Sequence, residues 1–582
     1  MSLLNSASLV VTPNGYKEGT LYSVIPNTTL GDMTVVRATT ATRVNSAGLI
    51  ELVPYNLLTW SEQFNNADWA LSSATISINA TTAPNDTLTA DKFIAAATNA
   101  VHFFQQSFIS SSYVFSIYAK AGEENVFSMW IANTSKRAEF NLTTGTIPLS
   151  TVANSSIVNV GNGWYRCSVY DSSPTTTYRI YGRTGSSYLG NGVDGMFFWG
   201  AQLNDGTTAK DYQKTETRLN IPRLDYSNGS CPSLLLEPQR TNLALYSEQF
   251  DNAIWTKTRL TISANTSVSP DGFTSADSVF ETTDNNTHLL FQRPNVTATN
   301  PFTFSCFVKA NGRRRLNLQI FDSSTLFASA LFDVISGVVI ATNGTSKIED
   351  YGNGWYRCAI SNVSPTTSLG YAQIGLATDT YTNANVLDSY VGDVTKGVLL
   401  YGAQFELGSY PTSYIPTTSA AVTRNADLIS KTGISSLIGQ TEGTLFVEMK
   451  LQNVNSASLY SGITSGSFAN AILIGKEAGV SPNKLALYIL ANGSTILGNT
   501  SISLTSNYVK CAIAYKSGSW SAYVNGTLID SGTSTFSFSA PFDIFGFGSN
   551  GSFTTLLDKT EVKTASLFPT RLTNAELASL TT

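Results

Sequence analysis

The two histidines of the chain are the residues best suited by type to acid–base chemistry or metal binding. His102 is followed four residues later by Gln106, and His288 is followed at the same spacing by Gln292. A catalytic histidine needs a nucleophile or a carboxylate beside it, whereas here only the glutamine is matched in both places. The pattern favours a structural histidine at the start of a strand. The alternative that we keep open is a His–Gln pair that binds a ligand.

Carboxylates show no arrangement that would support catalysis. A glycoside hydrolase needs two carboxyl groups that flank the bond to be cleaved, but the alternating segment 444–450 carries only Glu448. The sequence also lacks a phosphate-binding glycine loop, a nucleophile elbow and a zincin helix. We therefore predict no catalytic residues and no enzyme activity, and a glycan-degrading enzyme is the least favoured alternative.

No metal or cofactor ligands can be assigned from residue spacing. The cysteines form no C-x-x-C pair, and no cysteine or histidine cluster has zinc spacing, so we expect mainly reduced thiols packed as small core residues. No cofactor is expected. Calcium is left open, because lectin-like sandwiches bind it through loop carboxylates and carbonyls. The cysteines are Cys167, Cys231, Cys306, Cys358 and Cys511.

Tryptophan side chains are well suited to stack on sugar rings. Most tryptophans are expected in the core or between domains, and nothing in the sequence singles out an exception. Trp520, beside a glycine turn, is kept with the two His–Gln pairs as a candidate ligand-binding residue. The four tryptophans considered for stacking are Trp60, Trp130, Trp199 and Trp520.

The composition indicates many short strands. Charged residues make up 13% and aromatic residues 11% of the 582 residues, which argues against long amphipathic helices and against disorder. The formal net charge is −5 without a concentrated basic footprint, so no nucleic-acid partner is expected. No apolar stretch is long enough to cross a bilayer and no signal peptide is visible, so we expect synthesis in the cytoplasm without membrane insertion.

An internal repeat must position the candidate residues. The segment 56–69 matches the segment 242–255 at an offset of 186, and the match continues without a gap through both His–Gln pairs. Further on, small insertions enlarge the offset, and Gly161–Cys167 aligns with Gly352–Cys358. Period-2 alternation and Asn-Gly turns predict that each copy is a β-sandwich.

The chain is therefore expected to contain five segments. The first is too short to build a large core alone, and we predict that it attaches the chain to a larger assembly. The predicted segments are residues 1–55 (N-terminal attachment segment), 56–216 (β-sandwich repeat 1), 217–241 (linker), 242–428 (β-sandwich repeat 2) and 429–582 (C-terminal domain).

The C-terminal domain has a different pattern. Residues 510–524 are typical of two strands joined by a glycine turn, and Asn525-Gly526 follows as a second turn. Thr573 and Glu576 match a capping box that opens a short terminal helix. This order resembles the concanavalin-like and laminin-G-like jelly rolls, which implies two curved antiparallel sheets that bind a glycan or a protein. The predicted fold class is all-β, with tandem jelly-roll or β-sandwich domains and a C-terminal lectin-like sandwich.

Long strings between residues 31 and 428 resemble tail and other virion structural proteins of bacteriophages, in which similar segments join sandwiches like carbohydrate-binding modules. In those relatives the N-terminal Thr-Arg strand leads directly into the Ile-Pro-Arg-Leu-Asp-Tyr segment. Here we expect the first repeat to be inserted between the two. The strings are Val36–Glu51, Ile221–Tyr226, Leu234–Leu243, Tyr246–Trp255 and Gly402–Thr418.

The resemblance implies a component of the virion surface that is synthesised in the host cytoplasm. We expect a tail-fibre or receptor-binding protein whose sandwiches bind a host surface glycan. The alternative is a head-fibre, capsid decoration or tail structural protein that binds other virion proteins. A homo-oligomer such as a trimer is expected, because symmetric assembly multiplies weak glycan contacts.

Overall fold

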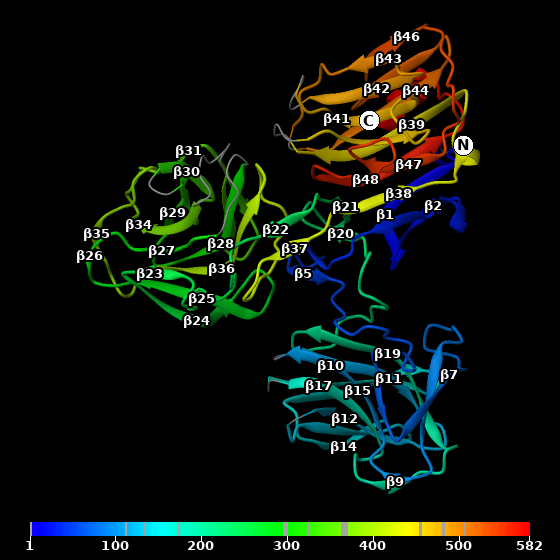
Figure 1. Ribbon diagram of the computed structural model, residues 1–582, viewed down its shortest axis with the longest axis vertical. Coiled ribbons are helices and arrows are strands. Elements are labelled where there is room, and N and C mark those ends of the chain that lie inside the picture. The colour runs from blue at the N-terminus through cyan, green and yellow to red at the C-terminus, as the bar shows by residue number, and fades with distance from the viewer. Residues whose placement is uncertain are drawn as a thin grey trace. The chain divides into compact units, whose positions relative to one another are not determined.

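The computed structural model describes residues 3–110, 113–132, 134–172, 175–294, 301–322, 325–361, 370–452, 457–479, 484–505 and 507–582. These residues form strands almost throughout, which confirms the all-β fold class. The chain folds as two compact units (Figure 1). One unit is Val53–Leu219. The other combines Met1–Leu52 with Asn220–Thr582, in agreement with the expected insertion of the first repeat.

Repeat 1 is a sandwich of two six-stranded antiparallel sheets. Its core is aromatic: the ring of Phe198 lies 5.3 Å from that of Phe104 and 5.2 Å from that of Phe127, which belong to the opposite sheet. In hydrogen-bonded order one sheet contains β14 (Thr146–Ser150), β13 (Arg137–Asn141), β12 (Val126–Ile131), β17 (Thr175–Gly182), β10 (Phe103–Ser110) and β6 (Ala70–Ser72). The other contains β15 (Asn154–Gly161), β16 (Trp164–Asp171), β11 (Tyr113–Lys120), β19 (Gly195–Asp205), β8 (Ala90–Ala95) and β7 (Ala74–Thr81), and a small ribbon pairs β9 (Asn99–Ala100) with β18 (Tyr188–Leu189).

Repeat 2 has the same strand order in both of its sheets. One sheet contains β31 (Val338–Asn343), β30 (Thr325–Asp333), β29 (Arg315–Asp322), β34 (Gly370–Ala377), β27 (Leu289–Gln292) and β23 (Thr256–Thr258). The other contains β32 (Thr345–Asp350), β33 (Trp355–Ser361), β28 (Phe302–Asn311), β36 (Gly397–Leu407), β25 (Thr274–Glu281) and β24 (Leu260–Val268). The ribbons β26 (Asn285–Asn286) with β35 (Tyr390–Val391) and β22 (Arg240–Asn242) with β37 (Val422–Arg424) complete it.

Repeat 2 begins with an asparagine whose side chain satisfies four buried backbone groups. Nδ2 of Asn242 donates to the carbonyl oxygens of Ala403 and Ile415 at 3.0 and 2.8 Å. Its Oδ1 accepts from the backbone N–H groups of Ala244 and Phe405, both at 3.0 Å. The side chain therefore ties the start of the repeat to its last long strand and to the segment that leaves it.

We predict that Asn242→Ala lowers the free energy of unfolding of the larger unit by about 3 kcal/mol, because four buried backbone groups lose their partners. Asn56 makes the equivalent four bonds in repeat 1, so Asn56→Ala should act in the same way on the unit Val53–Leu219. Urea unfolding followed by tryptophan fluorescence measures both effects. A loss below about 1 kcal/mol in both variants would contradict the role assigned to the asparagines.

The largest sheet takes three strands from the N-terminal segment. The strands β1 (Leu9–Lys17), β2 (Thr20–Ile25) and β3 (Met33–Val36) lie side by side between β48 (Thr560–Phe568) and β38 (Leu428–Lys431). The boundary predicted at residue 429 therefore leaves out strands that complete the C-terminal sandwich. Pairing between segments several hundred residues apart leaves no local sequence pattern, which is why the prediction missed it.

The same sheet folds into two layers, in which β41 (Ala471–Lys476) packs across β39 (Glu442–Leu451) and β44 (Val509–Lys516). Met33 and Leu21 of the N-terminal strands lie in its core. The terminal helix α1 (Asn574–Thr581) begins with the predicted capping box at Thr573. The remaining strands are β43 (Ser494–Asn499), β42 (Leu485–Ala491), β40 (Leu459–Thr464), β47 (Ile544–Gly548), β45 (Trp520–Val524), β46 (Thr527–Gly532), β20 (Arg223–Asp225) and β21 (Ser233–Leu236), and β4 (Ala41–Val44) pairs with β5 (Ile50–Val53) beside them.

A buried ion cluster joins the segments of the larger unit. Asp427 accepts from Arg37 at 2.6 Å and from Arg223. Glu237 accepts from Arg223 at 2.8 Å and forms an ion pair with Arg424 at the same distance. None of these side chains is more than 3% exposed. Burial alone would raise the pKa of Glu237, but Arg424 and Arg223 hold it well below its usual range. The ion cluster thus joins the N-terminal segment, the linker and the end of repeat 2, and each charged side chain in it is stabilised by the opposite charges around it.

Repeat 2 also places two half-buried carboxyl groups around one phenol. The hydroxyl of Tyr401 lies 3.1 Å from Oε1 of Glu248 and 3.0 Å from Oδ2 of Asp271. The hydroxyl of Tyr414 donates to the same oxygen of Glu248 at 3.0 Å. Burial and the nearby carboxylate of Asp271 raise the pKa of Glu248 to about 7, with a smaller contribution from Asp277.

The raised pKa of Glu248 predicts pH-dependent stability. The folded unit binds this proton more tightly than the unfolded chain, so the stabilisation is complete below the ordinary pKa of 4.5 and is lost as the pH rises through 7. We expect the free energy of unfolding of the larger unit to fall by at most about 3 kcal/mol between pH 4.5 and 7 because of Glu248. The variant Glu248→Gln should not show this fall. Urea unfolding at pH 5 and pH 7.5 measures the difference.

The equivalent residue of repeat 1 provides the control. Glu62 has a counter-charge, because Nζ of Lys214 lies 3.2 Å from its Oε2, whereas Pro416 occupies the lysine position in repeat 2. Glu62→Gln should therefore leave the pH dependence of the larger unit unchanged. Identical pH dependence in the unmodified protein and in Glu248→Gln would contradict the prediction.

Candidate functional site

The outer face of one sheet of repeat 1 carries two rows of side chains. Phe104, Phe127 and Ile180 point into the core, so the alternating residues between them point outward from β10, β17, β12 and β13. Four neighbouring strands span about 14 Å, which is enough for a ligand longer than one ring. The strand register aligns Gln105, Arg179, Trp130 and Arg137 in one row and Phe103, Tyr181, Ser128 and Glu139 in the next.

Aromatic rings and guanidinium groups alternate across these rows. The ring of Tyr181 lies 5.0 Å from that of Trp130 and 5.2 Å from that of Phe103. The guanidinium of Arg137 lies over Trp130 at 4.7 Å, and that of Arg179 lies over Phe103 at 4.8 Å. Cation–π contacts hold each guanidinium against a ring, while neighbouring rings are tilted by 53° to one another, so the centre of the face is a contiguous aromatic surface.

Hydrogen bonds fix the orientation of the central groups. Nε1 of Trp130 donates to the hydroxyl of Ser128 at 2.9 Å. Nη1 of Arg179 donates to the hydroxyl of Tyr181 at 3.1 Å, and its Nε donates to Oε1 of Gln105. The indole and the guanidinium are therefore held in place before any ligand arrives.

This face combines a stacking surface with hydrogen-bond donors. An indole packs well against the apolar face of a sugar ring, and guanidinium and amide groups bond hydroxyls. The side chain of Arg137 is 32% exposed and lies 3.6 Å from Glu139, the single carboxylate of the two rows. Because glycoside hydrolysis needs two carboxylates, the rows are suited to binding and lack the pair required for cleavage.

The corresponding rows of repeat 2 have a different chemistry. Gln319 occupies the position of Trp130, and Gly375 occupies that of Tyr181. Gln319 is 1% exposed, so the equivalent position in repeat 2 is closed to solvent. The full rows of repeat 2 are Phe291, Gln373, Gln319 and Ser329, followed by Leu289, Gly375, Asn317 and Leu331.

A loop of repeat 2 covers these rows. Nε2 of Gln319 and Nδ2 of Asn317 both donate to the carbonyl oxygen of Ala384 at 3.0 Å. A Cβ on Gly375 would lie 2.5 Å from the side chain of Leu387, so the glycine makes room for the loop. The connection spans residues 378–389 here, against residues 183–187 in repeat 1. The longer loop thus fills the place that Trp130 and Tyr181 occupy in repeat 1.

The two histidines lie at equivalent buried positions. The ring nitrogens of His102 face the carbonyl oxygens of Ser73 and Tyr188, and those of His288 face the carbonyl oxygens of Arg259 and Tyr390. Both imidazoles are 0% exposed, and each packs against a tyrosine ring. These contacts support the structural interpretation, and ligand binding by the histidines stays a prediction.

The two glutamines hold the first loop of each repeat. Oε1 of Gln106 accepts from the backbone N–H of Thr59 at 2.9 Å, and Nε2 donates to the carbonyl of the same residue at 3.1 Å. Gln292 makes the same pair of bonds with Leu245 at 2.6 and 2.9 Å. The structure does not bring a histidine and its glutamine together at one ligand, because their side chains bond separate backbone segments.

The remaining candidate, Trp520, also lies in the interior. Trp520 is 7% exposed and packs in the C-terminal core against Gly532.

Among the described residues, no group of three or more histidine, cysteine or acidic side chains is placed to hold a metal ion. No helix in the described part of the chain is long and apolar enough to cross a membrane.

Comparisons with known proteins give little further information. No family model and no curated protein matches the chain. It is similar to the *Ruminococcus gnavus* IT-sialidase CBM40 bound to alpha2,3 sialyllactose, with 14% identity over 27% of this chain and 93% of that one and a TM-score of 0.22. It is also similar to the CBM22-1-CBM22-2 tandem of *Paenibacillus barcinonensis* Xyn10C (10% identity, 61% and 98% covered, TM-score 0.20) and to *Trypanosoma rangeli* sialidase with sialic acid (10%, 94% and 97%, 0.19). TM-scores this low carry no inference about this chain.

Proposed function

We propose that this protein is a non-enzymatic surface component of a bacteriophage particle, of the tail-fibre or receptor-binding type, that binds a host surface glycan. The observation that carries the proposal is the outer face of repeat 1, where Trp130 lies between Arg137 and Arg179 in a row of half-buried side chains. The virion assignment rests on the resemblance of residues 31–428 to phage structural proteins.

The two repeats are assigned different tasks. In repeat 2, the side chains of Gln319 and Asn317 donate hydrogen bonds to the loop residue Ala384. The rows of repeat 2 therefore pack against their own loop. This favours a structural task for repeat 2, such as spacing the domains or contacting other virion proteins. The alternative for the whole chain, a decoration or tail structural protein, would extend that task to repeat 1.

A glycan array probed with the full chain tests the proposal, with calcium included because lectin-like sandwiches use it. We expect saturable binding to a subset of surface glycans, competed by the free oligosaccharide, and adhesion of the protein to cells that display it. Absence of saturable binding at high protein concentration would favour the decoration or structural alternative. Release of shortened oligosaccharides from the array would contradict the non-enzymatic assignment.

A further inference from the structure

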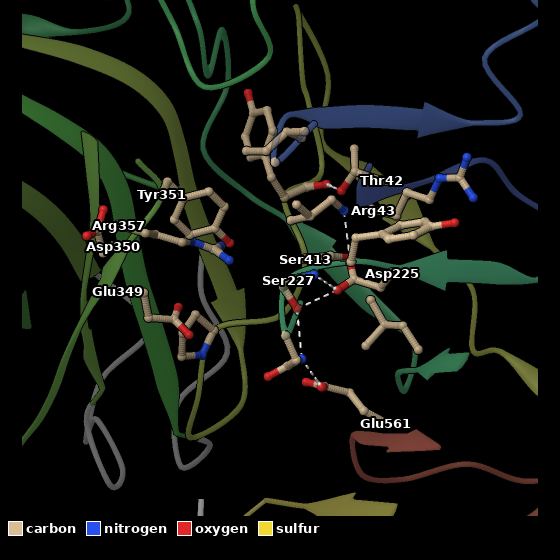
Figure 2. A pocket seen from close by; sticks show the side chains of 18 of the residues that line it. Thr42, Arg43, Asp225, Ser227, Glu349, Asp350, Tyr351, Arg357, Ser413 and Glu561 are labelled. Carbon is tan, nitrogen blue, oxygen red and sulfur yellow. Dashed lines mark hydrogen bonds between the residues drawn. The ribbon is translucent and has the colours of Figure 1, made fainter. Parts of the chain in front are cut away.

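The larger unit contains a cavity of about 590 Å³ (Figure 2). This volume lies within the range typical of small-molecule sites. Figure 2 shows Glu349, Tyr351 and Arg357 on one side and Asp225 and Glu561 on the other. The cavity is lined by the N-terminal hairpin (42–50), the linker (225–228), repeat 2 (347–357 and 411–414) and the C-terminal sandwich (450–452 and 559–561).

The walls are held in place without a ligand. The carboxylate of Asp225 accepts from the backbone N–H of Val44 at 2.8 Å and from that of Ser227 at 3.0 Å. The hydroxyl of Ser413 bonds Glu237 and Arg223 of the buried ion cluster, both at 2.7 Å. The free-energy cost of ordering these side chains when a ligand binds is therefore small.

The charges of the lining nearly balance, and five of the charged side chains pair within it. The lining includes five cationic and four anionic side chains. Lys347 lies 2.6 Å from Glu349, while Lys450 and Lys559 lie 3.8 and 3.9 Å from Glu561. A strongly charged ligand would have to break these pairs, so the lining does not select for net charge in either direction.

The lining instead offers separate donors and acceptors. Carboxylates accept hydrogen bonds only, and lysine and arginine donate only, whereas a sugar hydroxyl does both. The hydroxyl of Tyr351 makes no hydrogen bond within the described residues, and its ring is braced by Phe307 at 4.9 Å. A compact, neutral ligand with many hydroxyl groups matches this set better than an ion or an apolar molecule.

We infer that this cavity is a second saccharide-binding site, which takes one neutral sugar unit independently of the outer face of repeat 1. The inference extends the proposed glycan binding to a second site but does not require the first. The two sites use different segments of the chain, so they can be removed one at a time.

Two variants of the full chain separate the sites. Ala47 lines the cavity and is exposed, so Ala47→Trp fills the cavity without disturbing the core. Trp130→Ala removes the stacking surface of repeat 1. Glucose, galactose and N-acetylglucosamine are titrated separately into each variant and into the double variant, with binding followed by saturation-transfer NMR. Thermal unfolding verifies that every variant is folded.

We expect at least one of the three sugars to bind saturably to Trp130→Ala, and Ala47→Trp in that background to weaken this binding at least tenfold. Tyr351→Phe, which removes only a hydroxyl, should weaken it several-fold. Persistence of binding in the double variant, or no binding of any of the three sugars by Trp130→Ala, would overturn the second site. Binding that survives Trp130→Ala unchanged but is lost in Ala47→Trp would support the cavity and count against the repeat 1 face.

Discussion

Replacing Trp130 by alanine should weaken glycan binding by about 30-fold, which corresponds to about 2 kcal/mol. The indole is the centre of the aromatic surface, with Tyr181 at 5.0 Å and the guanidinium of Arg137 at 4.7 Å. Its removal deletes the stacking surface and releases the arginine that packs on it. Titration of the oligosaccharide selected on the array, followed by calorimetry, measures the loss.

Gln319→Ala is the matched control, because Gln319 occupies the equivalent position of repeat 2 beneath its own loop. This variant should bind the same oligosaccharide as tightly as the unmodified protein. Equal losses in the two variants would show that repeat 2 contributes to the site. An unchanged affinity in Trp130→Ala would remove the basis for the proposed function.

Replacing Arg223 by methionine should destabilise the larger unit by at least about 3 kcal/mol. The guanidinium bonds both Asp427 and Glu237, and its loss takes one charged hydrogen-bond partner from each of these buried carboxylates. Arg37 stays beside Asp427, and Arg424 and Lys559 stay beside Glu237, so part of the charge compensation remains. Methionine keeps most of the volume, so the effect reports the charge rather than a cavity.

Denaturant unfolding with separate resolution of the two units is the appropriate measurement. Only the transition of the unit that contains Arg223 should move, and the unit Val53–Leu219 should unfold as before. Lys347→Met is the control, because Lys347 pairs with Glu349 at the surface with 53% of its side chain exposed, and such pairs contribute below about 1 kcal/mol. Similar losses in the two variants would contradict the distinction between buried and exposed pairs.

Much of the fold follows from local sequence patterns. Matched strings predict two sandwiches, and the structure has the same strand order in both repeats. The capping box predicted from Thr573 and Glu576 begins the terminal helix. These features depend on neighbours in sequence, and so they leave a visible pattern. The strands β1–β3 leave none, because their partners β38 and β48 lie several hundred residues away.

The candidate site was harder to predict for a related reason. Trp130 was one of four tryptophans that could stack on a sugar, but its neighbours on the outer face come from four strands that only the register aligns. The feature of the sequence that could have indicated the site is a difference between the repeats: Gln319 and Gly375 of repeat 2 stand at the positions of Trp130 and Tyr181 in repeat 1. The His–Gln pairs occur in both repeats because both repeats need them for folding: each glutamine bonds the backbone of the first loop.

A crystal structure of the full chain with its best oligosaccharide from the array tests the central claim most directly. We predict a sugar ring stacked on the indole of Trp130, with its hydroxyls within hydrogen-bond distance of Arg179 and Gln105. An oligosaccharide bound only at another surface, with the outer face of repeat 1 empty, would contradict the claim.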